Sequence, residues 1–271
     1  MFKIALSAGH GFHTSGKRCP GYLDPHETRE WYLNDRICDK IEQKLTAYAG
    51  YELIRLDDTT GQTDVPLKDR TSKANNFKAD FYLSIHHNAG VGGKSGGGVV
   101  AYVYPGVGNV TLDWQKALYD AVIKHTGLRG NRAKPLAQSN LHEVRESNMP
   151  AVLLECGFMD SSTDVPIILS DDFANKVATA CVEVLVAKGG LTEKNIAVKP
   201  APVVPANSLY FEKYVGDTCS IVTALNSLGV ASTYAYRSKI AKANGIKYYM
   251  GTAKQNTAML NLLKQGKLIK P

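Results

Sequence analysis

The chain of 271 residues lacks the cysteine spacing typical of disulfide frameworks and of zinc fingers. Its five cysteines, an odd number, are scattered along the sequence, and no two form a CxxC pair. No apolar run approaches the ~18 residues that a membrane-spanning helix needs, so we expect no membrane insertion. Synthesis in a reducing cytosol fits this cysteine usage best.

We also expect no signal peptide at the N-terminus. The segment MFKIALSAGHG contains one lysine and then an apolar run too short for such a peptide. We therefore expect no export by the general secretory route. The glycines at 92–98 include Gly93-Lys94-Ser95, but Asn88 stands where a phosphate-binding loop needs glycine. A flexible hairpin loop is the better interpretation, and no nucleotide site is predicted.

The net charge of +7 is confined to the last quarter of the chain. From residue 201 on there are nine Lys or Arg and two Asp or Glu, which leaves 23 of the 32 basic residues and 23 of the 25 acidic ones in the remainder. A segment with three prolines and few large apolar side chains separates the two parts. We predict a neutral domain at 1–190, a linker at 191–207 and a basic domain at 208–271.

The first domain alternates apolar, β-branched runs with helical patterns, which predicts an α/β fold with a sheet covered by helices. Strands are expected at 3–7, 51–56, 81–85, 99–104 and 151–154, and helices at 25–47, 67–77, 112–125 and 172–188. The second domain has three helical patterns, each followed by a glycine typical of a helix C-terminus. Short helices are therefore expected at 218–228, 232–244 and 253–265, giving a small, mainly helical domain.

Two histidines and a glutamate follow three of the predicted strands. They are His10, His86 and Glu155. Open parallel sheets build their sites at the carboxyl ends of strands, because the loops there converge. A zinc hydrolase needs three ligands of the His and Glu type, an open position for water and a base. The pattern therefore predicts a metal hydrolase with His10 and His86 as ligands and Glu155 as the base, although Glu155 could also be a buried salt-bridge acid.

The third ligand is expected to be a carboxylate of the helix at 25–47, either Glu27 or Glu30. At ~100° per residue, Glu30 lies about 20° from the buried Ile37 and Glu27 about 80° from it. The sequence Asp24-Pro25-His26-Glu27 also has the pattern of a helix start, which would give Glu27 a capping role. We therefore prefer Glu30. His87 is the weaker alternative to His86, since neighbours on an extended chain face opposite sides.

These residues lie in stretches through which residues 1–190 resemble the zinc-dependent N-acetylmuramoyl-L-alanine amidases of type 3. The stretches are SAGHG at 7–11, EWYLN at 30–34, DRTSKANNFKADFYLSIHHNAG at 69–90, GLRGNRAKP at 127–135 and MPAVLLECGFMDSSTD at 149–164. The resemblance implies a mostly parallel twisted sheet flanked by helices. It also implies a Zn²⁺ cofactor held by His10, Glu30 and His86, with Glu155 as the catalytic residue. We expect three further residues to bind substrate: Asn88, Arg132 and Arg145.

Residues 208–271 resemble the small wall-binding module of some phage endolysins of Bacillus and related hosts. The stretches that carry this are SIVTALNSLGVASTYAYRSKIAKANGI and GTAKQNTAMLNLLKQGKLIKP. Positive charge favours an anionic polymer, such as the teichoic acids of Gram-positive walls. Tyrosines could stack on sugar rings, although they could also fill a small core, and the charge could be an ordinary solvated surface. The residues expected to bind the wall are Tyr234, Tyr236, Arg237 and Lys239.

Together these features predict a peptidoglycan hydrolase of the endolysin type. It would cleave the amide between MurNAc and the L-alanine of the stem peptide. It would remain in the host cytoplasm until a pore-forming holin released it to the Gram-positive cell wall. Two alternatives remain: a zinc carboxypeptidase or endopeptidase acting within the stem peptide, and a wall-binding protein without catalysis. Nucleic-acid binding is not expected, because the basic residues form no recognition motif.

Overall fold

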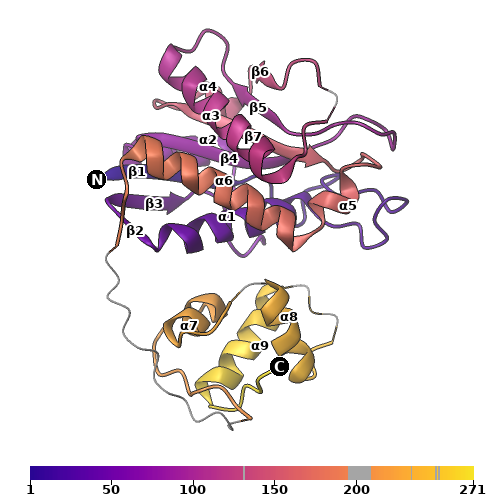
Figure 1. The fold of residues 1–271 in the computed structure, drawn as a ribbon, viewed down its shortest axis with the longest axis vertical. Helices are drawn as coiled ribbons and strands as arrows, with labels where there is room; N and C mark the ends of the chain where they lie inside the picture. Colours follow the sequence, from indigo (N-terminus) through magenta and orange to yellow (C-terminus); the bar gives the residue numbers. More distant parts are fainter. Residues whose placement is uncertain (131, 195–208, 233, 248, 250) are drawn as a thin grey trace. The chain divides into compact units, whose positions relative to one another are not determined.

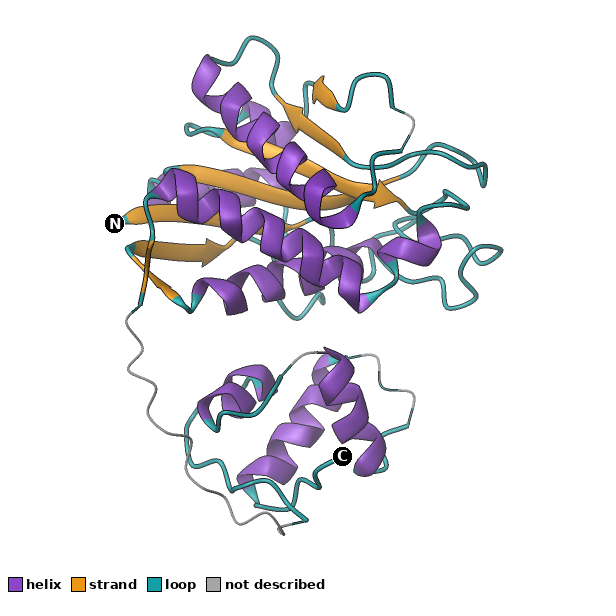
Figure 2. Cartoon of the chain, viewed as in Figure 1, coloured by secondary structure: helices purple, strands orange, loops and turns teal. Residues whose placement is uncertain are grey.

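The apolar runs of the first part of the chain form a six-stranded sheet with helices on its faces (Figures 1 and 2). In this computed structural model, the structure describes residues 1–271 except 131, 195–208, 233, 248 and 250. The spatial order of the strands is β3-β1-β4-β7-β5-β6, and each neighbouring pair is parallel except β5 with β7. The predicted α/β fold with a mostly parallel sheet is confirmed. The strands are β1 (Phe2–Ala8), β3 (Tyr51–Arg55), β4 (Phe81–Asn88), β5 (Val100–Val103), β6 (Leu136–Gln138) and β7 (Ala151–Phe158).

Helices cover the two faces of this sheet unequally. The larger core lies under α1 (Glu30–Leu45), α3 (Asn109–Thr126) and α6 (Asp171–Gly189), which Figure 1 shows in front of the sheet. A smaller core lies on the other face, where α2 (Leu67–Phe77) and α4 (His142–Arg145) pack. A short helix, α5 (Val165–Ile168), precedes α6. Side chains alternate along a strand. Phe81, Leu83 and Ile85 of β4 therefore point into the larger core, and Tyr82 points into the smaller one.

Two strands extend at least three residues beyond their predicted C-terminal ends, and this changes where the expected site residues lie. The strand β4 continues to Asn88 and β7 continues to Phe158. His86 and Glu155 are therefore inside their strands, not after them, and they are register partners on neighbouring strands. His10 does follow β1, as expected. The predicted ends were wrong because the polar residues at 86–88 and at 155 are typical of a loop in a sequence.

The helix predicted from residue 25 begins five residues later, at Glu30. The backbone of Glu27 has a φ of 46°, which interrupts a right-handed helix. The chain forms a turn here instead, and Arg18 and Arg29, on either side of this turn, pair as an antiparallel β-bridge. Asp24 caps this turn, because its carboxylate accepts hydrogen bonds from the backbone N–H groups of His26 and Thr28 at 3.1 and 2.7 Å. The predicted capping role of Glu27 in a helix was therefore wrong.

The chain divides into two compact units, Met1–Asn195 and Ile196–Pro271. The predicted linker at 191–207 starts too early, because Thr192–Glu193 form the strand β8, which pairs with β2 (Tyr48–Ala49). From residue 195 on, that linker lies outside the described residues. No helix in the part of the chain that the structure describes has the length and apolar character to cross a membrane.

The second unit is mainly helical, as predicted, and has its own apolar core. Its helices are α7 (Ile221–Ser227), α8 (Tyr234–Ala243) and α9 (Ala253–Lys264). The start of α9 is a capping box, in which the Thr252 side chain accepts from the backbone N–H of Gln255 and the Gln255 side chain accepts from that of Thr252. The buried core side chains include Phe211, Ile221, Leu225, Ile240, Met259, Leu263 and Leu268.

Candidate active site

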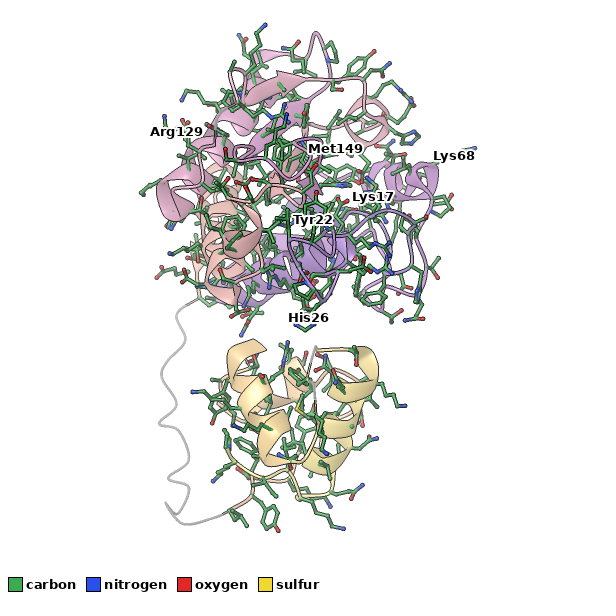
Figure 3. All side chains as sticks on the ribbon, turned by 90° about the vertical axis from the view of Figure 1, so that its right-hand side faces the viewer. Lys17, Tyr22, His26, Lys68, Arg129 and Met149 are labelled. Atoms are coloured by element: carbon green, nitrogen blue, oxygen red, sulfur yellow. The ribbon has the colours of Figure 1, made fainter. Side chains whose placement is uncertain are left out.

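Three potential metal ligands meet at the carboxyl edge of the sheet, the side toward which Figure 3 looks. His10 follows β1, Glu30 is the first residue of α1, and His86 lies near the end of β4. One ligand atom from each residue lies within 4.8 Å of the others. The three segments are far apart in the sequence, and the parallel pairing of β1 with β4 brings the two histidines together.

Glu30 is at the centre of this cluster. Its Oε2 lies 3.4 Å from Nε2 of His10, and its Oε1 lies 3.1 Å from Nδ1 of His86. The side chain is 1% exposed, and Oε2 accepts no hydrogen bond from the described residues. Although burial alone would raise it, the close contacts with the imidazoles of His10 and His86 hold the pKa of Glu30 well below its ordinary value. A buried carboxylate with an unused oxygen between two imidazoles fits a divalent cation, and the donor set is that of catalytic zinc sites.

The backbone of the SAGHG segment allows this close arrangement. A Cβ atom at Gly9 would lie 2.1 Å from Cε1 of His86, so only glycine leaves room for the imidazole ring. His10 itself has a φ of 67°, in the left-handed region that residues other than glycine rarely adopt. Such strain is maintained only where the surrounding structure supports it, and it occurs frequently at functional sites.

Glu155 lies beside His86 on the neighbouring strand β7. Its Oε2 is buried and has no hydrogen-bond partner among the described residues. Burial raises the pKa of Glu155 from an ordinary 4.5 to about 7; the charge on Glu30 acts in the same direction, while the charges of His86 and Lys17 oppose it. A carboxylate with a pKa near 7 can both accept and release a proton at neutral pH.

The two alternatives to the preferred ligands lie away from the cluster. Glu27 has a side chain that is 45% exposed and forms an ion pair with Arg18 at 3.4 Å. His87 is buried on the opposite face of β4, where its Nδ1 lies 2.8 Å from Oδ1 of Asn34 on α1. Burial lowers the pKa of His87 to about 3, which keeps its ring neutral. Neither residue belongs to the cluster of potential ligands.

The three expected substrate-binding residues lie in different surroundings. Asn88 is the last residue of β4, and its Oδ1 accepts a hydrogen bond from the backbone N–H of Ala89. The guanidinium of Arg132 lies 4.4 Å from the ring centroid of Phe158. Arg145 is exposed at the end of α4 and pairs with Glu146 at 2.6 Å. Substrate contact by these residues stays a prediction.

Two residues that the sequence did not single out contribute charge to the site. The Nζ atom of Lys17, which Figure 3 labels, lies 3.7 Å from Oε2 of Glu30. Glu143, on α4, is 3% exposed, and its Oε2 lies 3.2 Å from Nε2 of His86. Lys17 could have been noticed as a cation in the loop after His10. Glu143 offered the weaker signal of an acid between the apolar Leu141 and Val144.

A cavity of about 290 Å³ opens beside the cluster. His10 and His86 line it together with Val65 and Pro66. This places an accessible space against the potential metal ligands, as a site for an extended substrate requires.

The four expected wall-binding residues all lie on α8. Tyr236 and Arg237 are half-buried and Lys239 is exposed, whereas the side chain of Tyr234 lies outside the described residues. Tyr236 also packs against the core of the second unit, so part of its surface serves stability.

Known proteins resemble this chain over its first unit. Residues 4–187 match the family Amidase_3, described as N-acetylmuramoyl-L-alanine amidase. The amidase CwlM of Bacillus licheniformis is 35% identical over 178 residues, which cover 66% of this chain and 65% of that protein. The endolysin of Bacillus phage SPP1 is 34% identical over 183 residues, 66% of this chain and 63% of the endolysin. The chain therefore spans just under two thirds of the length of these relatives.

Solved structures show the same fold. The catalytic domain of the amidase CwlV from Bacillus (Paenibacillus) polymyxa var. colistinus has a TM-score of 0.62 at 24% identity, covering 71% of this chain and all of that one. An N-acetylmuramoyl-L-alanine amidase from Clostridium difficile 630 has a TM-score of 0.62 at 25% identity, covering 69% of this chain and 95% of the other. With the family match extending over more than half of its length, this chain belongs to the Amidase_3 family of N-acetylmuramoyl-L-alanine amidases.

Proposed function

We propose that this chain is a peptidoglycan hydrolase that cleaves the amide between the lactyl group of MurNAc and the L-alanine of the stem peptide. The observation that carries the proposal is the cluster of His10, Glu30 and His86 with Glu155 on the adjacent strand. This arrangement suits hydrolysis of an amide. Membership of the amidase family and the names of the relatives support the choice of bond.

The cofactor in this proposal is Zn²⁺, held by His10, Glu30 and His86. When bound, it supplies Lewis-acid chemistry, because it lowers the pKa of a water molecule and polarises a carbonyl group. The burial of Glu30 supports the assignment, as does its Oε2 atom, which accepts no hydrogen bond from the described residues. Two imidazoles and one carboxylate leave a coordination position for water or substrate.

Glu155 acts as base and then as acid. It accepts a proton from the attacking water while the water oxygen forms a bond to the amide carbon, and it returns that proton to the nitrogen as the C–N bond breaks. The products are a free lactyl carboxylate and a new N-terminal alanine. A pKa of about 7 suits both steps, because proton uptake and release are then nearly balanced.

The second unit holds the enzyme on a Gram-positive cell wall in this proposal. Two observations support this role. From position 201 on there are nine basic residues and two acidic ones, and this unit has an apolar core of its own. An anionic wall polymer is the chemistry that fits this charge, with Tyr236, Arg237 and Lys239 of α8, together with Tyr234, as the contacts. A relative named as a phage endolysin supports a lytic role. We propose in addition that the protein waits in the host cytoplasm until a holin pore releases it.

Digestion of purified sacculi tests the function. The amidase is expected to release intact stem peptides with a new N-terminal alanine and to create no reducing sugar ends. Mass spectrometry distinguishes the rivals: shortened peptides still attached to MurNAc would identify a carboxypeptidase or endopeptidase. Adsorption to the walls with no product, and no change on substitution of Glu155, would identify a protein that only binds.

A further inference from the structure

Glu143 is a buried carboxylate that the proposed reaction does not use. It lies on α4 and is 3% exposed. Burying an ionised carboxylate without partners is costly, and here three side chains supply the partners. They are Tyr82, Ser84 and His86, which alternate along β4 and so point to the same face of the sheet.

The contacts of Glu143 determine what its carboxylate can do. The hydroxyl of Tyr82 donates to Oε1, and Oγ of Ser84 lies 3.1 Å from both carboxylate oxygens. Nε2 of His86 lies 3.2 Å from Oε2. An ionised carboxylate only accepts hydrogen bonds. His86 must therefore carry its proton on Nε2 to make this contact.

This contact has a consequence at the other ring nitrogen. His86 can donate to Glu143 only from Nε2 and to Glu30 only from Nδ1. A metal bound in the cluster would take the place of the hydrogen on Nδ1, so the ring would keep its hydrogen on Nε2 and have its free electron pair on Nδ1. Nδ1 is the atom that faces Oε1 of Glu30 in the ligand cluster, at 3.1 Å. In metalloproteins, a carboxylate that accepts from the second nitrogen of a ligand histidine fixes the tautomer and the ring orientation.

We propose that Glu143 is a positioning residue for the metal site. It accepts the Nε2–H of His86 and holds the ring with Nδ1 toward Glu30 and His10. The inference rests on the proposed metal function of that cluster. A second anchor acts on the other histidine ligand: Nη2 of the buried Arg70 donates to the carbonyl of His10 at 3.0 Å, and its Nη1 donates to Oγ of Ser7 at 2.7 Å. Arg70 of α2 and Glu143 of α4 thus each form a hydrogen bond to one of the two histidines.

A purely structural role for Glu143 makes a different prediction. If Glu143 only neutralised buried donors, its replacement would lower stability without changing the affinity of the folded protein for metal. The substitution Glu143→Gln keeps the size and one acceptor oxygen but removes the charge. Tyr82→Phe is the matched control, because it removes a hydrogen bond to Glu143 without touching His86.

The experiment uses the full chain and measures Zn²⁺ affinity by competition with a chromogenic chelator. We expect Glu143→Gln to weaken Zn²⁺ binding by about 10- to 100-fold and Tyr82→Phe to weaken it less. Equal affinity of folded Glu143→Gln and wild type would overturn the inference while leaving the proposed function intact. Failure of the wild type to bind Zn²⁺ would overturn both.

A second measurement does not depend on any variant. In the Zn²⁺-loaded wild type with ¹⁵N-labelled histidine, the NMR signals of His86 should show a hydrogen on Nε2 and coordination through Nδ1. Coordination through Nε2 would overturn the inference, because that atom could not then donate to Glu143. This measurement decides the question even if Glu143→Gln does not fold.

Discussion

The two units of the chain bury different kinds of side chain. The interior of the first unit contains ionisable groups next to the sheet edge, among them Glu30, His86 and Glu143, each less than a tenth exposed. In the second unit, the described core is built from apolar side chains and Tyr249, and the charged residues lie outside it. Buried ionisable groups cost stability unless they are paired, and they are typical of functional sites. The buried ionisable groups therefore point to chemistry in the first unit, whereas the charged residues of the second unit are available only at its surface.

Removing the carboxylate at the centre of the cluster should have the largest effect. We expect Glu30→Gln to lose bound Zn²⁺ and to reduce hydrolysis of sacculi to background, because the site would then lack its anionic ligand. Metal content after dialysis and release of N-terminal alanine are the measurements. Glu27→Gln is the matched control, since Glu27 pairs with Arg18 at the surface. Loss of metal in the control but not in Glu30→Gln would reverse the ligand assignment.

Substituting the proposed base, Glu155, should have the second-largest effect on activity. We expect Glu155→Gln to keep Zn²⁺ but to lower kcat by about 10² to 10⁴-fold, the range for loss of a general base. Adsorption of the variant to cell walls should equal that of the wild type, since the second unit is unchanged. A variant with nearly normal kcat would show that Glu155 is an ordinary buried acid.

The raised pKa of Glu155 also predicts a pH-dependent stability of the metal-free protein. Its pKa is about 7 in the folded state and near 4.5 in an unfolded chain, so the unfolded state loses this proton first as pH rises. The free energy of unfolding of the wild type should therefore fall relative to Glu155→Gln between about pH 5 and pH 8, by about 3 kcal/mol in total. Urea unfolding in the presence of a chelator measures it. A constant difference across this pH range would contradict the assignment.

Deleting the second unit should have the smallest effect on chemistry and a moderate one on binding. We expect residues 1–195 alone to cleave soluble wall fragments at the wild-type rate, because the ligand cluster and Glu155 lie within that unit. Pelleting with intact walls should drop by about tenfold, because the basic unit that would attract an anionic wall polymer is removed. Moderate salt screens the weaker non-specific attraction that remains. Equal pelleting of both proteins would show that the second unit does not bind the wall.

Much of this fold could be predicted from local patterns. Period-two and period-3.6 apolar runs identified the five longest strands, apart from their ends, and the helix at 67–77 to the residue. The three-residue strand β6 and the short helices α4 and α5 were missed, because elements of that length have no clear period. Helical phase correctly placed Glu30 on the buried side of α1, but the same argument did not apply to Glu27, because that residue lies before the helix begins.

Other features depend on contacts between distant segments. The start of α1 was predicted wrongly because Asp24 caps a turn that is held by the bridge between Arg18 and Arg29. Glu143 went unnoticed for the same reason. Its importance comes from contacts with Tyr82, Ser84 and His86, which are about 60 residues away along the chain.

The amino-acid sequence by itself determined which residues could do chemistry and which faces of its helices and strands would be buried, because side-chain type and local period are properties of the chain. Only the tertiary structure decided which nitrogen of His86 faces Glu30, and only it leaves Oε2 of Glu155 buried without a hydrogen-bond partner among the described residues. The protonation and orientation of a side chain depend on charges and donors within a few ångströms. In this protein those neighbours come from other strands and helices.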